Sequence, residues 1–220
     1  QKWPFGFEVV QSSGVRETPE RSLVVQRFFP GERDRGLVVT QPLIFRSLLL
    51  KLGVFNGVQT GFADPNSYKD GVASLRFSVA NVEGGASAYY GKGIANSAGG
   101  LYYGSRDVKS RWGVDLQYYL HNLSLKGEYI QGQGIDGGNQ SAPFDPSFTT
   151  ASHSGWWAQA AYTLARANQF VAKYETLSLD PLNPTLGRRS AWNLGYIRWL
   201  DEKNRFKLFY IVNEEQHMSF

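Results

Sequence analysis

Cysteine is absent from this 220-residue sequence, which excludes disulfide frameworks and thiolate metal sites. Charge is also scarce: 19% of the residues are charged, against about 25% in an average globular chain. No run of about 18 or more apolar residues occurs, so the sequence predicts no membrane-spanning helix. The mean hydropathy of −0.35 is low. A barrel that crosses a membrane also has a low mean hydropathy, because half of each strand faces water.

Histidine is rare, and its three copies do not form a site. His121, His153 and His217 fall in unrelated segments, and no nucleophile motif lies beside His121 or His153. We therefore expect no enzyme, no metal site and no cofactor. The net charge of +4 is small and scattered, so nucleic acid is not an expected partner either, although small anions are plausible ones.

Aromatic residues (15%) and glycine (24 residues) are abundant, which favours strands and turns. The clearest pattern is in residues 111–133, where apolar and polar residues alternate on either side of a turn at His121-Asn122. One face of the first strand carries Val114, Leu116, Tyr118 and Leu120, and the other carries Asp115, Gln117 and Tyr119. Such a hairpin fits a soluble sandwich, or a strand between lipid and water.

Similar alternation predicts about eleven strands and no amphipathic helix. They are expected at residues 3–10, 37–40, 48–55, 71–80, 86–92, 114–120, 123–129, 155–164, 170–179, 190–200 and 205–213. The alternation is irregular near Gly195, which indicates a bulge. Residues 11–36 are predicted to be a long polar loop.

The connections alternate between short turns and long loops. The turns fall near residues 83–85, 121–122, 165–168 and 201–204, and the loops at 56–70, 93–110, 134–154 and 180–189. Outer-membrane barrels have this asymmetry, and aromatic residues near strand ends, such as Trp156-Trp157, correspond to their interfacial girdles. The predicted fold is therefore an all-β, antiparallel transmembrane β-barrel, with a soluble β-rich binding protein as the alternative.

Four motifs follow one another in the first sixty residues: KWPFG from Lys2, ERS from Glu20, PGERDRG from Pro30 and GVFNG from Gly53. In this order they resemble the phosphate-selective porin O/P family of Gram-negative outer membranes. The resemblance implies an outer-membrane location, and a barrel of about sixteen strands that leaves an aqueous channel. It also implies contact with outer-membrane lipid and lipopolysaccharide, small anions such as phosphate as solutes, and a homotrimer.

The strand count is lower than the family's, and the KWPFG motif stands at residue 2. We therefore expect residues 1–220 to form a single β-barrel domain that is part of a longer barrel. The sequence begins at Gln1 with no signal segment before it, so either a leader was removed or the sequence starts partway along a longer protein.

Charged residues at inward strand positions are the predicted lining of the pore. They are Lys51, Arg76, Asp115, Lys126, Glu128, Lys173, Glu175 and Lys207. As a set they either lower the barrier for anions or are ordinary solvated lumen residues in ion pairs.

The loop at residues 11–36 is the candidate constriction. Its arginines are Arg16, Arg21, Arg27, Arg33 and Arg35. They either fold inward to hold an anion by forked hydrogen bonds or belong to an ordinary surface loop, whose acidic residues cancel most of the charge.

The predicted function is that of an outer-membrane porin for passive diffusion of small hydrophilic solutes, preferably anions. The alternative is a non-conducting outer-membrane barrel that serves as a structural or assembly scaffold for partner proteins.

Overall fold

The structure is a computed structural model, and its described part covers most of the chain. It comprises residues 1–29, 31, 33–44, 47–60, 68–92, 95–97, 100–102, 108–133, 152–165, 167–178, 188–201 and 204–216. In this part no helix is long and apolar enough to cross a membrane.

One short helix and twelve strands make up the described chain. In order they are α1 (Leu23–Phe28), β1 (Asp34–Leu43), β2 (Leu48–Gln59), β3 (Asp70–Val79), β4 (Val82–Lys92), β5 (Ala95–Ser97), β6 (Gly100–Tyr102), β7 (Val108–Leu120), β8 (Leu123–Gln133), β9 (His153–Leu164), β10 (Asn168–Ser178), β11 (Arg188–Trp199) and β12 (Arg205–Gln216).

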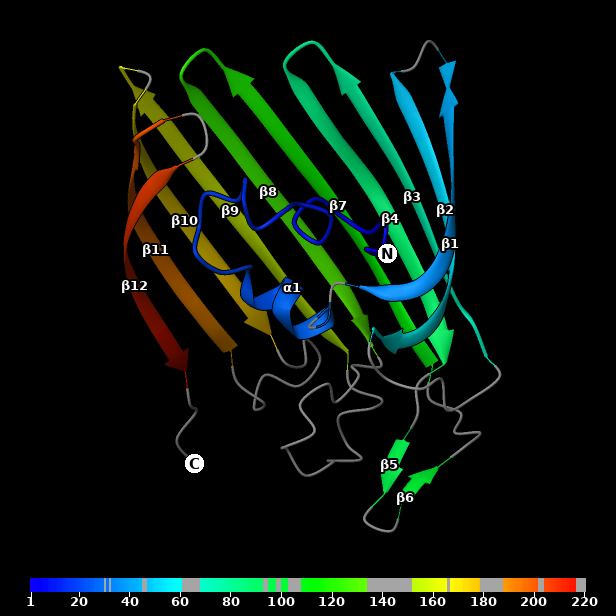
Figure 1. Ribbon diagram of the computed structural model, residues 1–220. Helices are drawn as coiled ribbons and strands as arrows, with labels where there is room; N and C mark the ends of the chain where they lie inside the picture. Colours follow the sequence, from blue (N-terminus) through cyan, green and yellow to red (C-terminus); the bar gives the residue numbers. More distant parts are fainter. Residues whose placement is uncertain are drawn as a thin grey trace.

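Ten of these strands form one antiparallel sheet in the order β1-β2-β3-β4-β7-β8-β9-β10-β11-β12. Neighbours in the sheet are neighbours along the chain, apart from the separate β5–β6 ribbon between β4 and β7. The strands are tilted side by side, and the sheet curves so that β1 and β12 stand at its two margins (Figure 1). The all-β antiparallel prediction is confirmed, and in the described residues the sheet is not closed, since β1 pairs with β2 alone and β12 with β11 alone.

The sequence alternation sets the register. In the predicted hairpin, β7 and β8 pair from Ser110↔Gln133 to Leu120↔Leu123 around the turn at His121. The bulge expected near Gly195 is wrong: β11 pairs without a shift on both sides, and a shift occurs instead between Asp34 and Gly36.

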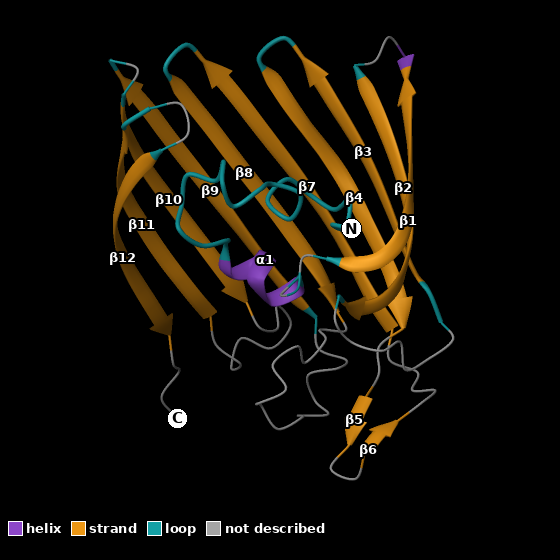
Figure 2. Cartoon of the chain, viewed as in Figure 1, coloured by secondary structure: helices purple, strands orange, loops and turns teal. Residues whose placement is uncertain are grey.

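Short turns and long connections lie at opposite ends of the sheet (Figure 2). The turns after β3, β7 and β9 contain Ala80, His121 and Ala165, whose φ angles of 50°, 47° and 50° are left-handed. The strands β2, β4, β8 and β10 end at the opposite end of the sheet, and more residues separate each of them from the next strand of the large sheet. This alternation of short and long spacings confirms the prediction. The turn expected at residues 83–85 is wrong, because β3 ends at Val79 and β4 begins at Val82, so residues 83–85 lie within β4. We call the two ends the short-turn end and the long-loop end.

Three predictions about smaller elements are wrong. Residues 3–10 do not form a strand, and the nearest strand-like pairing is an isolated bridge between Lys2 and Arg33. Residues 11–36 are not a plain loop, because α1 lies within them and buries Val24, Val25 and Phe28. The ribbon β5–β6 falls within the predicted loop 93–110.

Residues 1–29, which we call the N-terminal segment, lie in the hollow of the curved sheet (Figures 1 and 2). This placement explains the missing strand: the first ten residues pack as a compact insert rather than along an edge. The face of the sheet toward the segment is called the inner face, and the opposite one the outer face.

Candidate functional site

The N-terminal segment supplies most of one buried apolar cluster. From the segment come Trp3, Phe5, Val9, Val24, Val25, Phe28 and Phe29, and from the inner face come Phe55, Val72, Tyr89, Ile130, Trp157 and Leu177. Phe5 is fully buried, and its ring centroid lies 4.6 Å from that of Phe29. Burial of one large side chain contributes about 1.5–3 kcal/mol, so the packing of these side chains would by itself hold the segment against the sheet.

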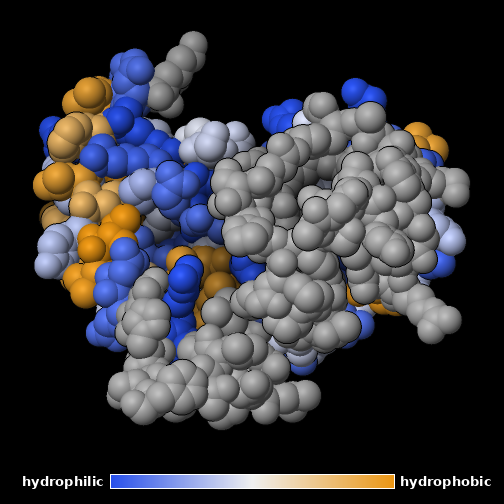
Figure 3. Space-filling view, turned by 90° about the horizontal axis from the view of Figure 1, so that it is seen from below, coloured by the Kyte–Doolittle hydropathy of each residue, from blue (hydrophilic) through white to orange (hydrophobic). Residues whose placement is uncertain are grey.

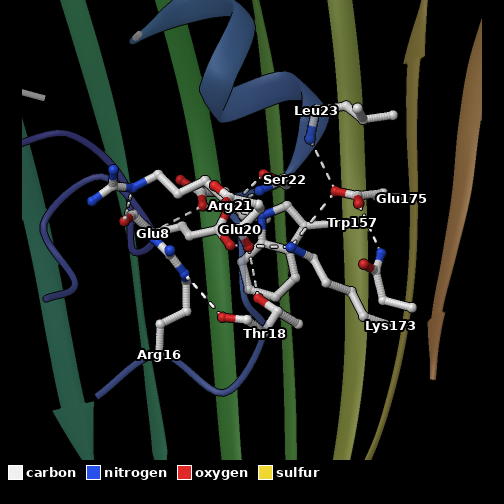
Figure 4. A network of polar contacts seen from close by, with 12 residues as sticks. Glu8, Arg16, Thr18, Glu20, Arg21, Ser22, Leu23, Trp157, Lys173 and Glu175 are labelled. Atoms are coloured by element: carbon white, nitrogen blue, oxygen red, sulfur yellow. Dashed lines mark hydrogen bonds and ion pairs between the residues drawn. The ribbon is translucent and has the colours of Figure 1, made fainter. Parts of the chain in front are cut away.

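A buried carboxylate on the segment binds the middle of β10 (Figure 4). Glu8 Oε1 lies 3.1 Å from Lys173 Nζ, and the side chains of both residues are at most 3% exposed. Glu8 Oε2 accepts the Ser22 N–H at 2.8 Å and the Ser22 hydroxyl, so it also fixes the residue before α1. A buried charge needs an opposite charge and hydrogen bonds, and Glu8 has both.

Glu175 extends this network to α1 and β11. Its Oε2 accepts the backbone N–H of Leu23, the first residue of α1, at 2.9 Å and lies 3.6 Å from Lys173 Nζ. Its Oε1 accepts a hydrogen bond from Asn193 Nδ2 at 2.8 Å. The predicted lumen residues Lys173 and Glu175 therefore hold the start of the helix.

Glu128 on β8 accepts hydrogen bonds from the turn near the start of the segment. Its two carboxylate oxygens accept the backbone N–H groups of Phe7 and Glu8, each at 3.2 Å, and Oε2 also accepts Trp157 Nε1 at 3.3 Å. Gly6 adopts φ +58°, and a Cβ atom there would come within 1.8 Å of Glu128 Oε1. Glycine is thus required at residue 6 both for its backbone angle and for the approach of the carboxylate.

Arg76 and Asp115 form a forked ion pair under the same turn. Arg76 Nη1 and Nη2 donate to Asp115 Oδ2 and Oδ1 at 2.9 and 2.8 Å, and Nη1 also donates to the carbonyl oxygen of Gly6 at 3.2 Å. Such bidentate pairs are among the stronger charge-assisted hydrogen bonds. The ion pair, formed by one residue of β3 and one of β7, therefore holds the backbone of the N-terminal segment at Gly6.

The opposite side of the hollow holds residues 14–17. Lys126 on β8 forms an ion pair with Glu17. Lys207 Nζ and Arg205 Nη2 on β12 donate to the carbonyl oxygen of Arg16 at 2.7 and 2.9 Å. The segment is therefore tied to strands on both sides of the hollow.

All eight predicted pore-lining residues lie on the inner face. Arg76, Lys126, Glu128, Lys173, Glu175 and Lys207 contact the N-terminal segment directly, and Asp115 acts through Arg76. Lys51 on β2 is half-buried on the same face. The structure thus brings the set together, and its role in lining a path for solutes stays a prediction.

The predicted constriction arginines divide into two groups. Arg16 and Arg21 are buried and donate to carbonyl oxygens of their own segment: Arg16 to Thr18 and Pro19, Arg21 to Glu8 and Gln11. Arg27 lies in α1. Arg33 and Arg35 are exposed where β1 begins.

Burial lowers the pKa of two of these arginines, the buried Arg21 and the half-buried Arg27. Burial, followed by the charge of Arg16, lowers the pKa of Arg21, while Glu8 and Glu20 act in the opposite direction. Burial, followed by the charge of Arg189, lowers the pKa of Arg27. The guanidinium groups of Arg16 and Arg21 donate hydrogen bonds to the backbone of their own segment, and the role of these arginines in holding an anion stays a prediction.

A second charged cluster near the long-loop end was missed by sequence reasoning. Lys109 Nζ lies 2.9 Å from Asp70 Oδ2, and both side chains are at most 2% exposed. Lys109 also donates to the carbonyl oxygen of Gly57 at 2.9 Å, and the Gly57 N–H donates to Asp34 Oδ2 at 2.7 Å. The signal was present, because Asp34, Asp70 and Lys109 all stand at or next to strand starts, but their pairing depends on register between strands.

Arg111 on β7 was missed for the same reason. It donates to the carbonyl oxygen of Phe28 at the end of α1, and its guanidinium carbon lies 4.9 and 4.7 Å from the ring centroids of Phe29 and Tyr89. It therefore supports the helix end by a hydrogen bond and by cation–π contact.

The outer face has the opposite character. Large apolar side chains stand exposed on strands along the whole sheet, among them Leu37, Leu52, Leu75, Trp112, Leu116, Leu125, Trp156, Phe170, Leu194 and Leu208. In the view from the long-loop end, hydrophobic residues gather along part of the outer rim and hydrophilic ones lie nearer the middle (Figure 3). Among the described residues, no second sheet packs against this face.

Aromatic residues on the outer face occupy two bands. Toward the long-loop end, ring contacts join Trp112 to Tyr129 and link Trp156, Tyr174 and Trp192, with centroids 4.8–5.4 Å apart. Toward the short-turn end, Phe170 contacts Tyr196 at 5.5 Å. Smaller side chains such as Ala158, Ala160 and Ala172 stand between the bands.

Among the described residues, no group of three or more His, Cys, Asp or Glu side chains is placed to hold a metal ion. No family model matches the sequence, and no curated protein matches it. The arrangement of the two faces is therefore the basis for a functional proposal.

Proposed function

We propose that this chain is part of an outer-membrane porin that allows small hydrophilic solutes to diffuse through its lumen. The observation that carries the proposal is the opposition of the two faces: exposed Leu, Val, Phe and Trp side chains outside, and buried or half-buried Lys, Arg, Asp and Glu inside. Membrane β-barrels have this alternation, with aromatic girdles at both interfaces. The two aromatic bands and the alternation of short turns with long loops fit the same class.

The N-terminal segment narrows the lumen in this proposal. It occupies the hollow and is bonded to β3, β7, β8, β10 and β12, so solutes pass between its surface and the remaining inner wall. Lys51 and Lys207, two of the inner cations that are only half-buried, bias that path toward anions such as phosphate. An unpaired strand edge is not viable in lipid, so β1 and β12 require pairing partners to complete the barrel.

Conductance in planar bilayers tests the proposal. The protein, extracted from membranes in detergent, should form open channels whose reversal potential in a salt gradient indicates a preference for anions. In the double variant Lys51→Gln/Lys207→Gln, the reversal potential should move toward the value expected for a cation-selective channel. The control variant Arg35→Gln, which removes an exposed cation outside the lumen, should move the reversal potential less. Absence of any conductance, with the protein folded, would contradict the porin function.

A second candidate is a non-conducting barrel that acts as a scaffold for partner proteins. The buried cluster between the N-terminal segment and the inner face favours it, because a dry, aromatic-rich contact obstructs a lumen. In that case the purified barrel conducts no ions and carries partner proteins in fixed ratio. The same bilayer recordings, combined with the composition of the purified complex, decide between the two.

A further inference from the structure

The outer face over β1–β4 contains an apolar depression of about 740 Å³. Its walls are formed by Leu37, Val39, Leu52, Val54, Tyr90 and Trp112. Its floor is formed by the small residues Gly71, Ala73 and Ala88, since the register places Gly71 between Val54 and Tyr90, and Ala73 between Leu52 and Ala88. A band of small residues between bulky ones therefore forms a groove in an otherwise flat apolar surface.

Basic residues stand at the long-loop end of this depression. Lys69 is exposed and lines it directly. Lys92 follows Tyr90 by two positions on β4, and its Nζ lies 3.9 Å from the centroid of the Tyr68 ring. Arg35 is exposed two residues before Leu37 on β1. Arg35, Lys69 and Lys92 thus stand at the long-loop ends of β1, β3 and β4.

At the opposite end of the same strands, the outer face is apolar rather than basic. Toward the short-turn end, the outward positions carry the apolar pairs Leu43↔Leu48 and Val79↔Val82. Two described acids at this end of the sheet, Asp34 and Asp70, are 1% exposed and bind partners on the inner side of the sheet. The described outward positions of β1–β4 carry no Asp or Glu.

We propose that this surface is a binding site for a membrane lipid that has several acyl chains and a phosphorylated headgroup. The acyl chains lie in the depression, and the phosphates contact Arg35, Lys69 and Lys92 at the level of the membrane interface. Clusters of basic residues beside a membrane recognise anionic headgroups, and Arg is suited to bidentate contact with phosphate. Tyr90 and Trp112 flank the site as interfacial aromatic residues do.

The site deepens the proposed function and depends on it, because the outer face must lie in a membrane. It also gives the membrane a direction, with the phosphorylated lipid in the leaflet at the long-loop end. A second copy of the chain is the poorer occupant, since a two-fold contact through this face sets the same basic rim against itself or near it.

Native mass spectrometry of the detergent-purified protein tests the site. Three lipids serve as probes: a hexa-acylated, bis-phosphorylated diglucosamine lipid (lipid A), the same lipid with its phosphates removed, and zwitterionic phosphatidylethanolamine. We expect the phosphorylated lipid to be retained in preference to the other two. Each of the substitutions Arg35→Gln, Lys69→Gln and Lys92→Gln should weaken its retention by about fivefold, and their combination should abolish the preference.

Arg198→Gln is the matched control, because Arg198 is an exposed cation on β11 near the short-turn end, where it contacts Asn168. It should leave the preference unchanged. Equal retention of all three lipids, or an equal loss in Arg198→Gln and in the three rim variants, would overturn the site while leaving the membrane barrel intact. A protein that needs no detergent and retains no lipid would overturn the proposed function as well.

Discussion

The two faces of the sheet are built from the same strands but follow opposite rules. On β10, Lys173 and Glu175 are buried on the inner face with partners from the N-terminal segment, while Phe170 between them and the turn is 51% exposed on the outer face. In a water-soluble protein the arrangement would be reversed, because burial of unpaired charge and exposure of large apolar patches are both unfavourable. The comparison teaches that the polar face is buried by the chain's own N-terminal segment, while the apolar face is left uncovered by the described residues, as the proposed membrane location requires.

The largest effect is expected from removing the central inner cation. Lys173→Met leaves Glu8 and Glu175 as uncompensated buried carboxylates, so the free energy of unfolding should fall by about 3–5 kcal/mol. Urea titration of the detergent-solubilised protein measures it. Ala172→Met, on the outer face of the same strand, is the control and should change the stability little; equal losses in the two variants would remove the difference between the faces.

An apolar pair sharpens the same contrast. Phe5→Ala removes a fully buried ring that stacks on Phe29, and should cost about 3–5 kcal/mol in the same titration. Phe206→Ala removes a ring that is 55% exposed on β12, and in detergent it should cost far less. If Phe206→Ala reduced the free energy of unfolding as much as Phe5→Ala, the outer face would have to be packed against protein.

Much of this contrast could be predicted from the sequence. The alternation of Val114 and Leu116 with Asp115 and Gln117 repeats in most strands, and a period of two assigns each side chain to a face without knowledge of the neighbours. The ten strands of the large sheet and the face on which each inward charge lies followed from it, whereas the short strands β5 and β6 did not. This local signal is independent of whether the sheet lies in lipid.

The N-terminal segment could not be predicted in this way. The pairing of Glu8 with Lys173 joins residues 165 positions apart, and α1 has six residues, too few for an apolar period to stand out. Its structure is set by contacts with the inner face. The same holds for Asp70 and Lys109, whose pairing depends on the register of β3, β4 and β7.

A charge on the outer face should have an intermediate effect that appears only in lipid. Leu116 is 53% exposed in the middle of β7, and Leu116→Arg should reduce stability in vesicles by about 2–4 kcal/mol if the site lies near the midplane. Folding from urea into phosphatidylcholine vesicles measures it, with Leu116→Phe as the control. An exposed position in water would tolerate the arginine, so an unchanged stability would contradict a lipid-facing strand.

The smallest effect is expected where the segment meets β12. Arg205→Gln weakens hydrogen bonds to the carbonyl oxygens of Gly14 and Arg16, at a cost of about 1 kcal/mol. Hydrogen exchange of the amides of residues 12–18 should accelerate, while that of residues 3–9, which pack in the apolar cluster, should not change. Uniform acceleration across both stretches would mean that the segment is released as one unit.

Spin labels on single introduced cysteines test most directly whether the outer face contacts hydrocarbon, and the natural lack of cysteine makes the labelling selective. In reconstituted vesicles, labels at Ala158, Leu116 and Leu194 should be relaxed by oxygen more than by a water-soluble nickel chelate. A label at the inward neighbour Gln159 should show little access to oxygen. A preference for the nickel chelate at the three outward positions, or equal protection at all four, would contradict the account.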